Sequence, residues 1–365
     1  MLAPVMNSQE ARSNAELGEQ RFRTQLLTWY DAHARDLPWR QSRDPYPVWL
    51  SEIMLQQTRV AAVIEHYHEF LRRFPTVEKL ARARKASVLA AWSGLGYYRR
   101  ARMLHSAAKV VARERGGEFP ATAEGLRDLP GVGRYTAAAI ASIAFGEAVA
   151  VVDGNVERVL QRVSGRRLAG EEFWRAAEIL LDRKRPGDFN QAMMELGATV
   201  CTPRAPACLT CPVVELCATR GELDGTAKKS RQKKREIHYA LARRDGAVFL
   251  VRRARDARLM AGMWELPEVE GSVVDAGKTQ VPRFARNDKK RRNDRTRESD
   301  SPLWFTVRHS ITVTDYTVRV WRAAVPVGVR GEWVAVERLE RVALTGLARK
   351  ILWKAEILVA PSAAV

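Results

Sequence analysis

Residues 129–156 read LPGVGRYTAAAIASIAFGEAVAVVDGNV and lie between segments with helical spacing of apolar residues. Gly131 and Gly133 allow the backbone to turn tightly and to present N–H groups at the start of the next helix. Such groups bind anions, including DNA phosphates. Asp153 follows about twenty residues later, directly before another helical run. Taken singly, an interhelical turn and a helix N-cap would explain both features. Together they favour a module of two helices joined by a hairpin that contacts a phosphate, with Arg134 beside it.

The chain around this module predicts an all-α domain over residues 21–225. Apolar residues recur at helical spacing within residues 49–74, and several other predicted helices end at glycine. No convincing strand pattern occurs before residue 217. Residues 1–20 are polar and rich in alanine, and we predict a flexible tail there.

A second domain, of the α+β class with a mainly antiparallel sheet, is predicted over residues 238–360. Strand-like runs alternate with turns, and residues 343–358 have helical spacing. The basic stretch 226–237 looks like an interdomain linker. Residues 283–300 carry dense charge and almost no apolar side chains, which predicts a disordered insertion. The sequence is compatible with two roles for this insertion, which are contact with phosphates and simple exposure to solvent.

The charge balance indicates a polyanionic partner. Lys and Arg number 61 against 42 Asp and Glu, a net charge of +19. Nucleic acid is the commonest partner of such a chain, although a solvated basic surface is the plain alternative. No apolar run of about 18 residues is present, and the N-terminus lacks the pattern of a secretory signal. We therefore expect a cytoplasmic protein associated with the nucleoid and not with a membrane.

All four cysteines lie close together in the pattern Cys201-x6-Cys208-x2-Cys211-x5-Cys217. In a reducing compartment, such a cluster indicates a metal site more than disulfides. Zinc and a [4Fe–4S] cluster both accept four thiolates, so residue type alone leaves the choice open.

A third motif contains the acid Glu52. It lies among apolar residues in Trp49-Leu50-Ser51-Glu52-Ile53-Met54-Leu55-Gln56-Gln57-Thr58. Burial there would raise the pKa of Glu52 and let it hold a proton near neutral pH. The ordinary alternative is a surface glutamate on an amphipathic helix.

These motifs resemble those of MutY-type adenine DNA glycosylases. The 6-2-5 cysteine spacing is similar to the iron–sulfur loop of the endonuclease III and MutY enzymes, and Ser51-Glu52-x-Met54-Leu55-Gln56-Gln57-Thr58 is typical of MutY. The resemblance is dense over residues 22–220 and thinner over residues 238–358. It implies a helix–hairpin–helix glycosylase domain with one [4Fe–4S] cluster on residues 201–217, followed by a Nudix-like domain.

The resemblance also implies roles for individual residues. Glu52 would be the general acid and base, and Asp153 would stabilise the oxocarbenium ion, with Tyr135 and Asn155 in support. The adenine pocket would be formed by Trp39, Arg40, Leu55 and Gln191. DNA contacts would come from Gln57, Thr58, Tyr97, Gly131, Gly133 and Arg134, with Gln57 and Tyr97 as wedges in the base stack. We expect a monomer that acts on duplex DNA with adenine opposite 8-oxoguanine or guanine.

Tyr135 distinguishes this chain from bifunctional relatives, which carry a lysine at that hairpin position to form a Schiff base. A tyrosine cannot form the imine, so we predict a monofunctional enzyme. Two alternatives remain: an endonuclease III-like glycosylase with lyase activity, and a non-catalytic iron–sulfur protein that only binds DNA.

The second domain departs from its relatives in two places. Residues 259–267 resemble the W-E-L-P lead of a Nudix-like fold, but the acidic metal box is missing, so we predict no Nudix hydrolysis. The family reads 8-oxoguanine through a Phe-Ser-His loop. The match on Arg308-His309 places Ile311-Thr312-Val313 there, which leaves Thr312 and His309 as the candidates for lesion recognition.

Overall fold

The computed structural model describes residues 8–223, 233–254, 256–257, 260–269, 303–311 and 314–358. The chain forms two compact units: the described parts of Met1–Ala83 and Arg100–Ala227, and the described parts of Arg84–Arg99 and Lys228–Val365. The predicted combination of an all-α domain and an α+β domain is confirmed. The boundary differs from the prediction, because residues 84–99 group with the C-terminal unit. Within the described chain, none of the helices is both long and apolar enough to cross a bilayer.

The first unit is helical. Its elements are α1 (Ser8–His33), η1 (Pro38–Arg40), α2 (Pro45–Leu55), α3 (Val60–Arg73), α4 (Val77–Arg82), α6 (Arg99–Glu114), α7 (Ala123–Leu126), α8 (Arg134–Phe145), α9 (Gly154–Ser164), α10 (Glu171–Leu180), α11 (Pro186–Thr199), η2 (Cys208–Thr210) and η3 (Val214–Leu216). Helix α1 begins at Ser8, so the predicted flexible tail was wrong for residues 8–20. Polar residues such as Glu, Gln and Arg, like Ala, are good helix formers, and polarity alone does not indicate a tail.

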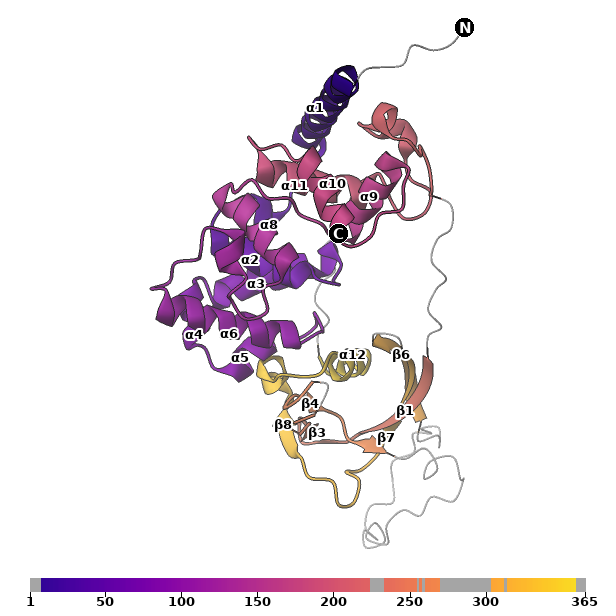
Figure 1. Ribbon diagram of the computed structural model, residues 1–365. Helices are drawn as coiled ribbons and strands as arrows, with labels where there is room; N and C mark the ends of the chain where they lie inside the picture. Colours follow the sequence, from indigo (N-terminus) through magenta and orange to yellow (C-terminus); the bar gives the residue numbers. More distant parts are fainter. Residues whose placement is uncertain are drawn as a thin grey trace, which may run out of the picture. The chain divides into compact units, whose positions relative to one another are not determined.

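Helix α11 packs against both α8 and α9 (Figure 1). Small residues allow their close packing: a Cβ added to Gly187 of α11 would lie 2.6 Å from the carbonyl oxygen of Ser142 in α8. The neighbouring core buries apolar residues of α1, α9, α10 and α11, among them Leu26, Val159, Ala192 and Leu196. This packing fixes the start of α8 and the start of α9, which carry Tyr135 and Asp153.

The second unit contains α5 (Lys85–Ala91), β1 (Lys233–Leu241), β2 (Arg243–Arg244), β3 (Ala247–Arg252), β4 (Trp264–Glu265), β5 (Glu268–Val269), β6 (Leu303–Ile311), β7 (Thr314–Arg322), β8 (Glu332–Ala335), η6 (Val336–Arg341) and α12 (Gly346–Lys354). One sheet has the order β5-β1-β7-β6, and in the other β3 pairs with β2, β4 and β8. The β1–β7 pair is parallel, and the other ladders are antiparallel. The apolar face of α12 packs on these strands (Figure 1).

Two sequence predictions fall at the edges of the described second unit. Strand β1 begins at Lys233, so residues 233–237 of the predicted linker are strand; their pairing with β7, which begins at Lys233↔Thr314, overrides the polar composition. The predicted insertion at 283–300, together with Thr312, lies outside the described residues.

Candidate active site

A pocket of about 550 Å³ opens in the helical unit. It is bounded by η1, the C-terminal end of α2, the starts of α8 and α9, and α11. This volume lies within the usual range for small-molecule sites. The predicted residues that line it are Trp39, Arg40, Glu52, Leu55, Gln57, Thr58, Tyr135, Asp153, Asn155 and Gln191. The structure thus gathers the predicted catalytic and adenine-pocket residues around one cavity.

Glu52 lies on the buried face of α2 and is only 5% exposed. The phenolic hydroxyl of Tyr135 donates a hydrogen bond to its Oε2 at 2.8 Å and also lies 3.4 Å from Sδ of Met194. Burial raises the pKa of Glu52 to about 7, against the opposing effect of the Tyr135 hydrogen bond, and the charge of Asp153 raises it further. A carboxyl group with this pKa holds a proton in a large fraction of molecules at neutral pH. The surface-glutamate alternative is wrong.

Asp153 is the N-cap of α9. Its Oδ1 accepts hydrogen bonds from the backbone N–H groups of Asn155 at 2.9 Å and Val156 at 2.7 Å, and its Oδ2 accepts from Nδ2 of Asn155 at 3.1 Å. The cap therefore orients the carboxylate at the positive end of the helix, where a negative charge is stabilised. A Cβ added to Gly197 of α11 would lie 2.6 Å from Cβ of Asn155, so this glycine admits the close approach of the two helices.

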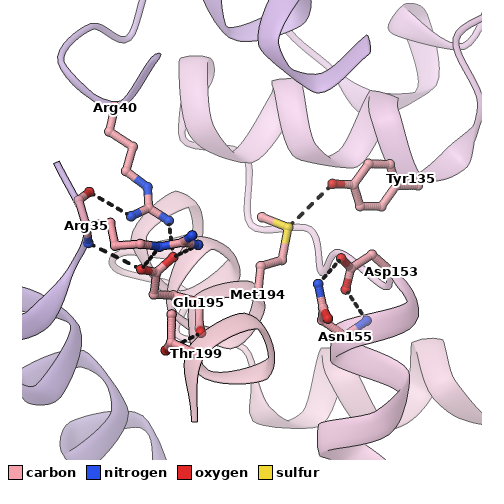
Figure 2. A network of polar contacts seen from close by, with 8 residues as sticks. All are labelled: Arg35, Arg40, Tyr135, Asp153, Asn155, Met194, Glu195 and Thr199. Carbon is pink, nitrogen blue, oxygen red and sulfur yellow. Dashed lines mark hydrogen bonds and ion pairs between the residues drawn. The ribbon is translucent and has the colours of Figure 1, made fainter. Parts of the chain in front are cut away.

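Glu195 on α11 is a charged residue of the pocket that the sequence analysis missed (Figure 2). It is 1% exposed, and its carboxylate accepts hydrogen bonds from Nε and Nη2 of Arg35 at 2.6 and 2.8 Å and from Nη2 of Arg40 at 2.8 Å. Burial alone would raise the pKa of Glu195, but the two guanidinium groups lower it to about 2. The sequence contained one indication that Glu195 lies at the pocket: it is four residues from the predicted pocket residue Gln191 and therefore shares its helix face.

Arg158 of α9 connects the active site with the cysteine loop. Its Nη2 donates to Oδ1 of Asn155 at 2.8 Å and to the carbonyl of Gly197 at 2.6 Å, while its Nε donates to the carbonyl of Cys201 at 2.8 Å. One guanidinium group thus fixes both the neighbour of Asp153 and the start of the cysteine segment.

The four cysteines line one cavity, whose other walls are mainly apolar residues together with Arg162 and Arg220. Nη1 of Arg162, which is 5% exposed, lies 3.3 Å from Sγ of Cys201 and donates to the carbonyl of Thr202 at 2.8 Å. Within the described ranges, no group of three or more His, Cys, Asp or Glu side chains is close enough together to hold a single metal ion, whereas a four-iron cluster binds its four thiolates at separate iron atoms. Four thiols around one sulfur-lined cavity, with a buried cation to offset negative charge, fit an iron–sulfur cluster.

The hairpin has the geometry that its glycines predict. Gly131 adopts a φ of +80°, and a Cβ there would lie 2.5 Å from Cβ of Met103, whereas Gly133 is the N-cap of α8 and has open space around it. The side chain of Arg134 is engaged within the protein: Nη1 lies 2.5 Å from Oε1 of Glu171, and the guanidinium lies 3.8 Å from the centre of the Trp174 ring.

Gln57 follows the end of α2 in a left-handed backbone conformation with a φ of +57°. Arg100 holds this turn: Nη1 donates to the carbonyls of Ile53, Met54 and Gln56, and Nη2 donates to Oγ1 of Thr58. Strained backbone conformations of this kind cluster at functional sites.

Two family models match the chain. Residues 50–172 match the HhH-GPD superfamily of base excision DNA repair proteins, and residues 238–354 match the NUDIX domain. An adenine DNA glycosylase of Schizosaccharomyces pombe is 34% identical over 334 residues, which cover 72% of this chain and 72% of the relative. The chain belongs to the adenine DNA glycosylase family.

Other members of the adenine DNA glycosylase family are more similar over shorter stretches. The human protein is 52% identical over 218 residues, which cover 56% of this chain but 40% of the human protein, and the mouse match covers 60% of the mouse protein. The chain therefore spans between two fifths and three fifths of these two relatives. Among solved structures, a thermostable thymine-DNA glycosylase superposes with a TM-score of 0.53 at 33% identity, covering 56% of this chain and 97% of that one.

The remaining predicted residues of this adenine DNA glycosylase family member lie in the second unit. Tyr97 is 45% exposed and has a left-handed backbone with a φ of +45°. His309 on β6 is partly buried, and burial, with the charge of Lys350, lowers the pKa of its imidazole. Thr312, its predicted companion, lies outside the described residues.

Proposed function

We propose that this protein is a monofunctional adenine DNA glycosylase of base excision repair. It hydrolyses the N-glycosidic bond of adenine paired with 8-oxoguanine or guanine in duplex DNA. The observation that carries the proposal is the pair of carboxyl groups in one pocket: Glu52 has a pKa near 7, and Asp153 is held by the N-terminus of α9. Two acids in different environments suit the two tasks of glycoside cleavage.

In the first step, the Glu52 carboxyl protonates N7 of adenine, and the C1′–N9 bond breaks with its electron pair going to the base. The sugar is left as an oxocarbenium ion, which the Asp153 carboxylate stabilises, with Asn155 holding that carboxylate in place. The Glu52 carboxylate then takes a proton from a water molecule as the water oxygen bonds to C1′. The products are free adenine and an abasic site. Tyr135 orients Glu52 through its hydrogen bond.

The target atoms are inaccessible in a stacked duplex, so adenine must be flipped into the pocket at a cost of a few kcal/mol. Trp39, Leu55 and Gln191 line the pocket, and we assign them, with Arg40, to adenine binding. Glu195 belongs with them because it fixes the Arg40 guanidinium at the pocket wall. Wedging by Gln57 and Tyr97, together with phosphate contacts at Gly131, Gly133 and Arg134, would offset part of the flipping cost.

Lyase chemistry is disfavoured by the pocket. Tyr135 stands at the hairpin position, and no lysine is among the described residues that line the cavity. A Schiff base requires a primary amine near C1′.

One [4Fe–4S] cluster would be held by Cys201, Cys208, Cys211 and Cys217. When bound, the cluster would join the two ends of the loop and hold basic neighbours such as Arg204 where they can contact DNA; with all four thiols as ligands, none would remain to act as a nucleophile. Iron and sulfide analysis of purified protein, expected to give four of each per chain, tests this assignment.

The C-terminal unit would read the lesion opposite adenine through the β6–β7 connection that contains Thr312, together with His309. The partner is then double-stranded DNA with adenine opposite 8-oxoguanine or guanine. We further propose that the protein acts as a monomer in association with the nucleoid.

The decisive experiment is single-turnover adenine release from a duplex with adenine opposite 8-oxoguanine, analysed with and without alkali. Release that requires Glu52, spares adenine opposite thymine and yields strand breaks only after alkali is the expected result. Strand breaks without alkali would indicate a lyase, and binding without release would indicate a non-catalytic DNA-binding protein; each would refute the proposal.

A further inference from the structure

The turn that carries Tyr97 has an unusual backbone. Gly94 and Gly96 adopt φ values of +115° and +68°, and Tyr97 follows at +45°. Nε1 of Trp92 donates to the carbonyl of Gly96 at 3.1 Å and closes the turn on one side. A tyrosine in the left-handed region is held there only when the surrounding structure fixes it.

Two residues that flank the turn converge on one acceptor. Oγ of Ser93 and the hydroxyl of Tyr98 donate to the carbonyl of Leu344 at 3.0 and 2.9 Å, and each side chain is 3% exposed. Nε of Arg349, in the first turn of α12, donates to Oγ of Ser93 at 2.9 Å. All of these residues belong to the second unit, although Ser93 and Tyr98 are some 250 residues away from Leu344 in the chain.

The acceptor itself is fixed by the W-E-L-P segment. The backbone N–H of Thr345 donates to the carbonyl of Trp264 at 2.8 Å, and the N–H of Trp264 donates to the carbonyl of Ala343 at 2.9 Å. The hydroxyl of Thr345 caps α12 by accepting from the N–H of Ala348 at 3.1 Å. The peptide of Leu344 therefore lies between an isolated parallel bridge to Trp264 and the N-cap of α12, and both restrain its position.

We propose that Ser93, Tyr98 and Arg349 are positioning residues for Tyr97. They transmit the fixed geometry of the C-terminal domain to the residue that wedges beside the damaged base pair. This inference rests on the proposed role of Tyr97 in DNA binding. The inference also assigns the W-E-L-P segment, residues 264–267, a function other than nucleotide hydrolysis. This segment fixes the Leu344 carbonyl, which in turn holds the Tyr97 turn.

A double-mutant cycle of Tyr98→Phe and Tyr97→Ala tests the proposal. Its readout is the affinity for a duplex with 8-oxoguanine opposite a 2′-fluoro adenine nucleotide, which resists cleavage. Removing the buried hydroxyl deletes the bond to Leu344, and we expect Tyr98→Phe alone to weaken binding about tenfold. In the Tyr97→Ala background, the same change should weaken binding less than twofold.

A merely structural role gives a different result, because a loss of stability would weaken binding equally in both backgrounds. A tenfold effect that persists without the Tyr97 ring therefore overturns the proposal, as does an unchanged affinity in Tyr98→Phe. Arg349→Ala should reproduce the coupling, whereas Arg338→Ala, at an exposed arginine of η6, should show neither effect. The double-mutant cycle measures duplex affinity alone. The proposed function is tested by adenine release from the unmodified protein, so the two proposals can fail independently of each other.

Discussion

The hydroxyl of Tyr135 lies 2.8 Å from Oε2 of Glu52, although the two residues are 83 positions apart in the chain. The hydrogen bond favours the ionised carboxylate, and burial favours the protonated acid. Burial dominates, and Glu52 is left with a pKa near neutrality. At neutral pH the carboxyl group can therefore hold a proton, and its ionised form destabilises the fold; both properties can be measured.

Glu52→Gln should abolish adenine release and stabilise the protein at alkaline pH. The pKa of Glu52 is raised from 4.5 to about 7 on folding, so the stability of the native protein is full below pH 4.5 and falls as the pH rises towards 7. The loss amounts to about 3 kcal/mol. Denaturation measured between pH 4 and pH 8.5 should show that the free energy of unfolding of the variant rises relative to that of the native protein as the pH increases. The exposed Glu65→Gln is the control, and equal stability of Glu52→Gln and native protein at pH 8.5 would contradict the buried acid.

Adenine release should decline as the pH rises through about 7, because only protonated Glu52 can donate to the base. Tyr135→Phe removes a hydrogen bond that lowers this pKa, so the alkaline limb of the rate profile should move to higher pH. The rate at neutral pH should fall by no more than about tenfold, the effect of one hydrogen bond. Tyr46→Phe, whose hydroxyl donates to the carbonyl of Phe74 away from the pocket, should leave the profile unmoved. A shift to lower pH in Tyr135→Phe would argue against the assignment.

Asp153→Asn separates helix capping from catalysis. Asparagine is an equally good N-cap, so the melting temperature should change little, but the charge that stabilises the cation is lost. Adenine release should fall by at least about 100-fold. Asp153→Ala should lose, in addition, about 1 kcal/mol of stability with the cap. If Asp153→Asn released adenine at the native rate, capping would be the whole role of this residue.

The two hairpin glycines should respond differently to alanine. Gly131 has a positive φ and lacks room for a Cβ beside Met103, so Gly131→Ala should lower stability by about 1–3 kcal/mol. Gly133 has open space, and Gly133→Ala should fold normally while weakening duplex binding, because its methyl group lies where a phosphate would approach. Thermal melts and duplex affinity measured on both variants check this. Similar melting temperatures for the two would be evidence against the strained turn.

Local patterns of the sequence were sufficient for much of the site. Glycine spacing predicted the hairpin, and cysteine spacing predicted that the four thiols lie around one cavity. Glu52 and Asp153 were singled out through the resemblance to MutY-type glycosylases, because a surface position for Glu52 and helix capping by Asp153 would each explain the residue taken alone. Glu195, Arg35 and Arg100 were missed, since their partners lie far away in the chain: Glu195 and Arg35 are separated by 160 positions. From the sequence alone, a charged residue on a helix is expected at the surface, because the distant arginine that neutralises it in the fold is not known.

By itself, the sequence determined the helical and α+β halves and the clustering of the four cysteines, because these depend on spacing along the chain and on residue chemistry; the two acids were proposed from the resemblance to a known family. Only the tertiary structure decided that α1 begins at Ser8, that residues 84–99 join the C-terminal unit, and that Glu52 is buried with a pKa near 7. Burial and hydrogen bonding between distant segments arise from packing. Two residues far apart in the chain gain their common electrostatic environment only when the helices that carry them come together.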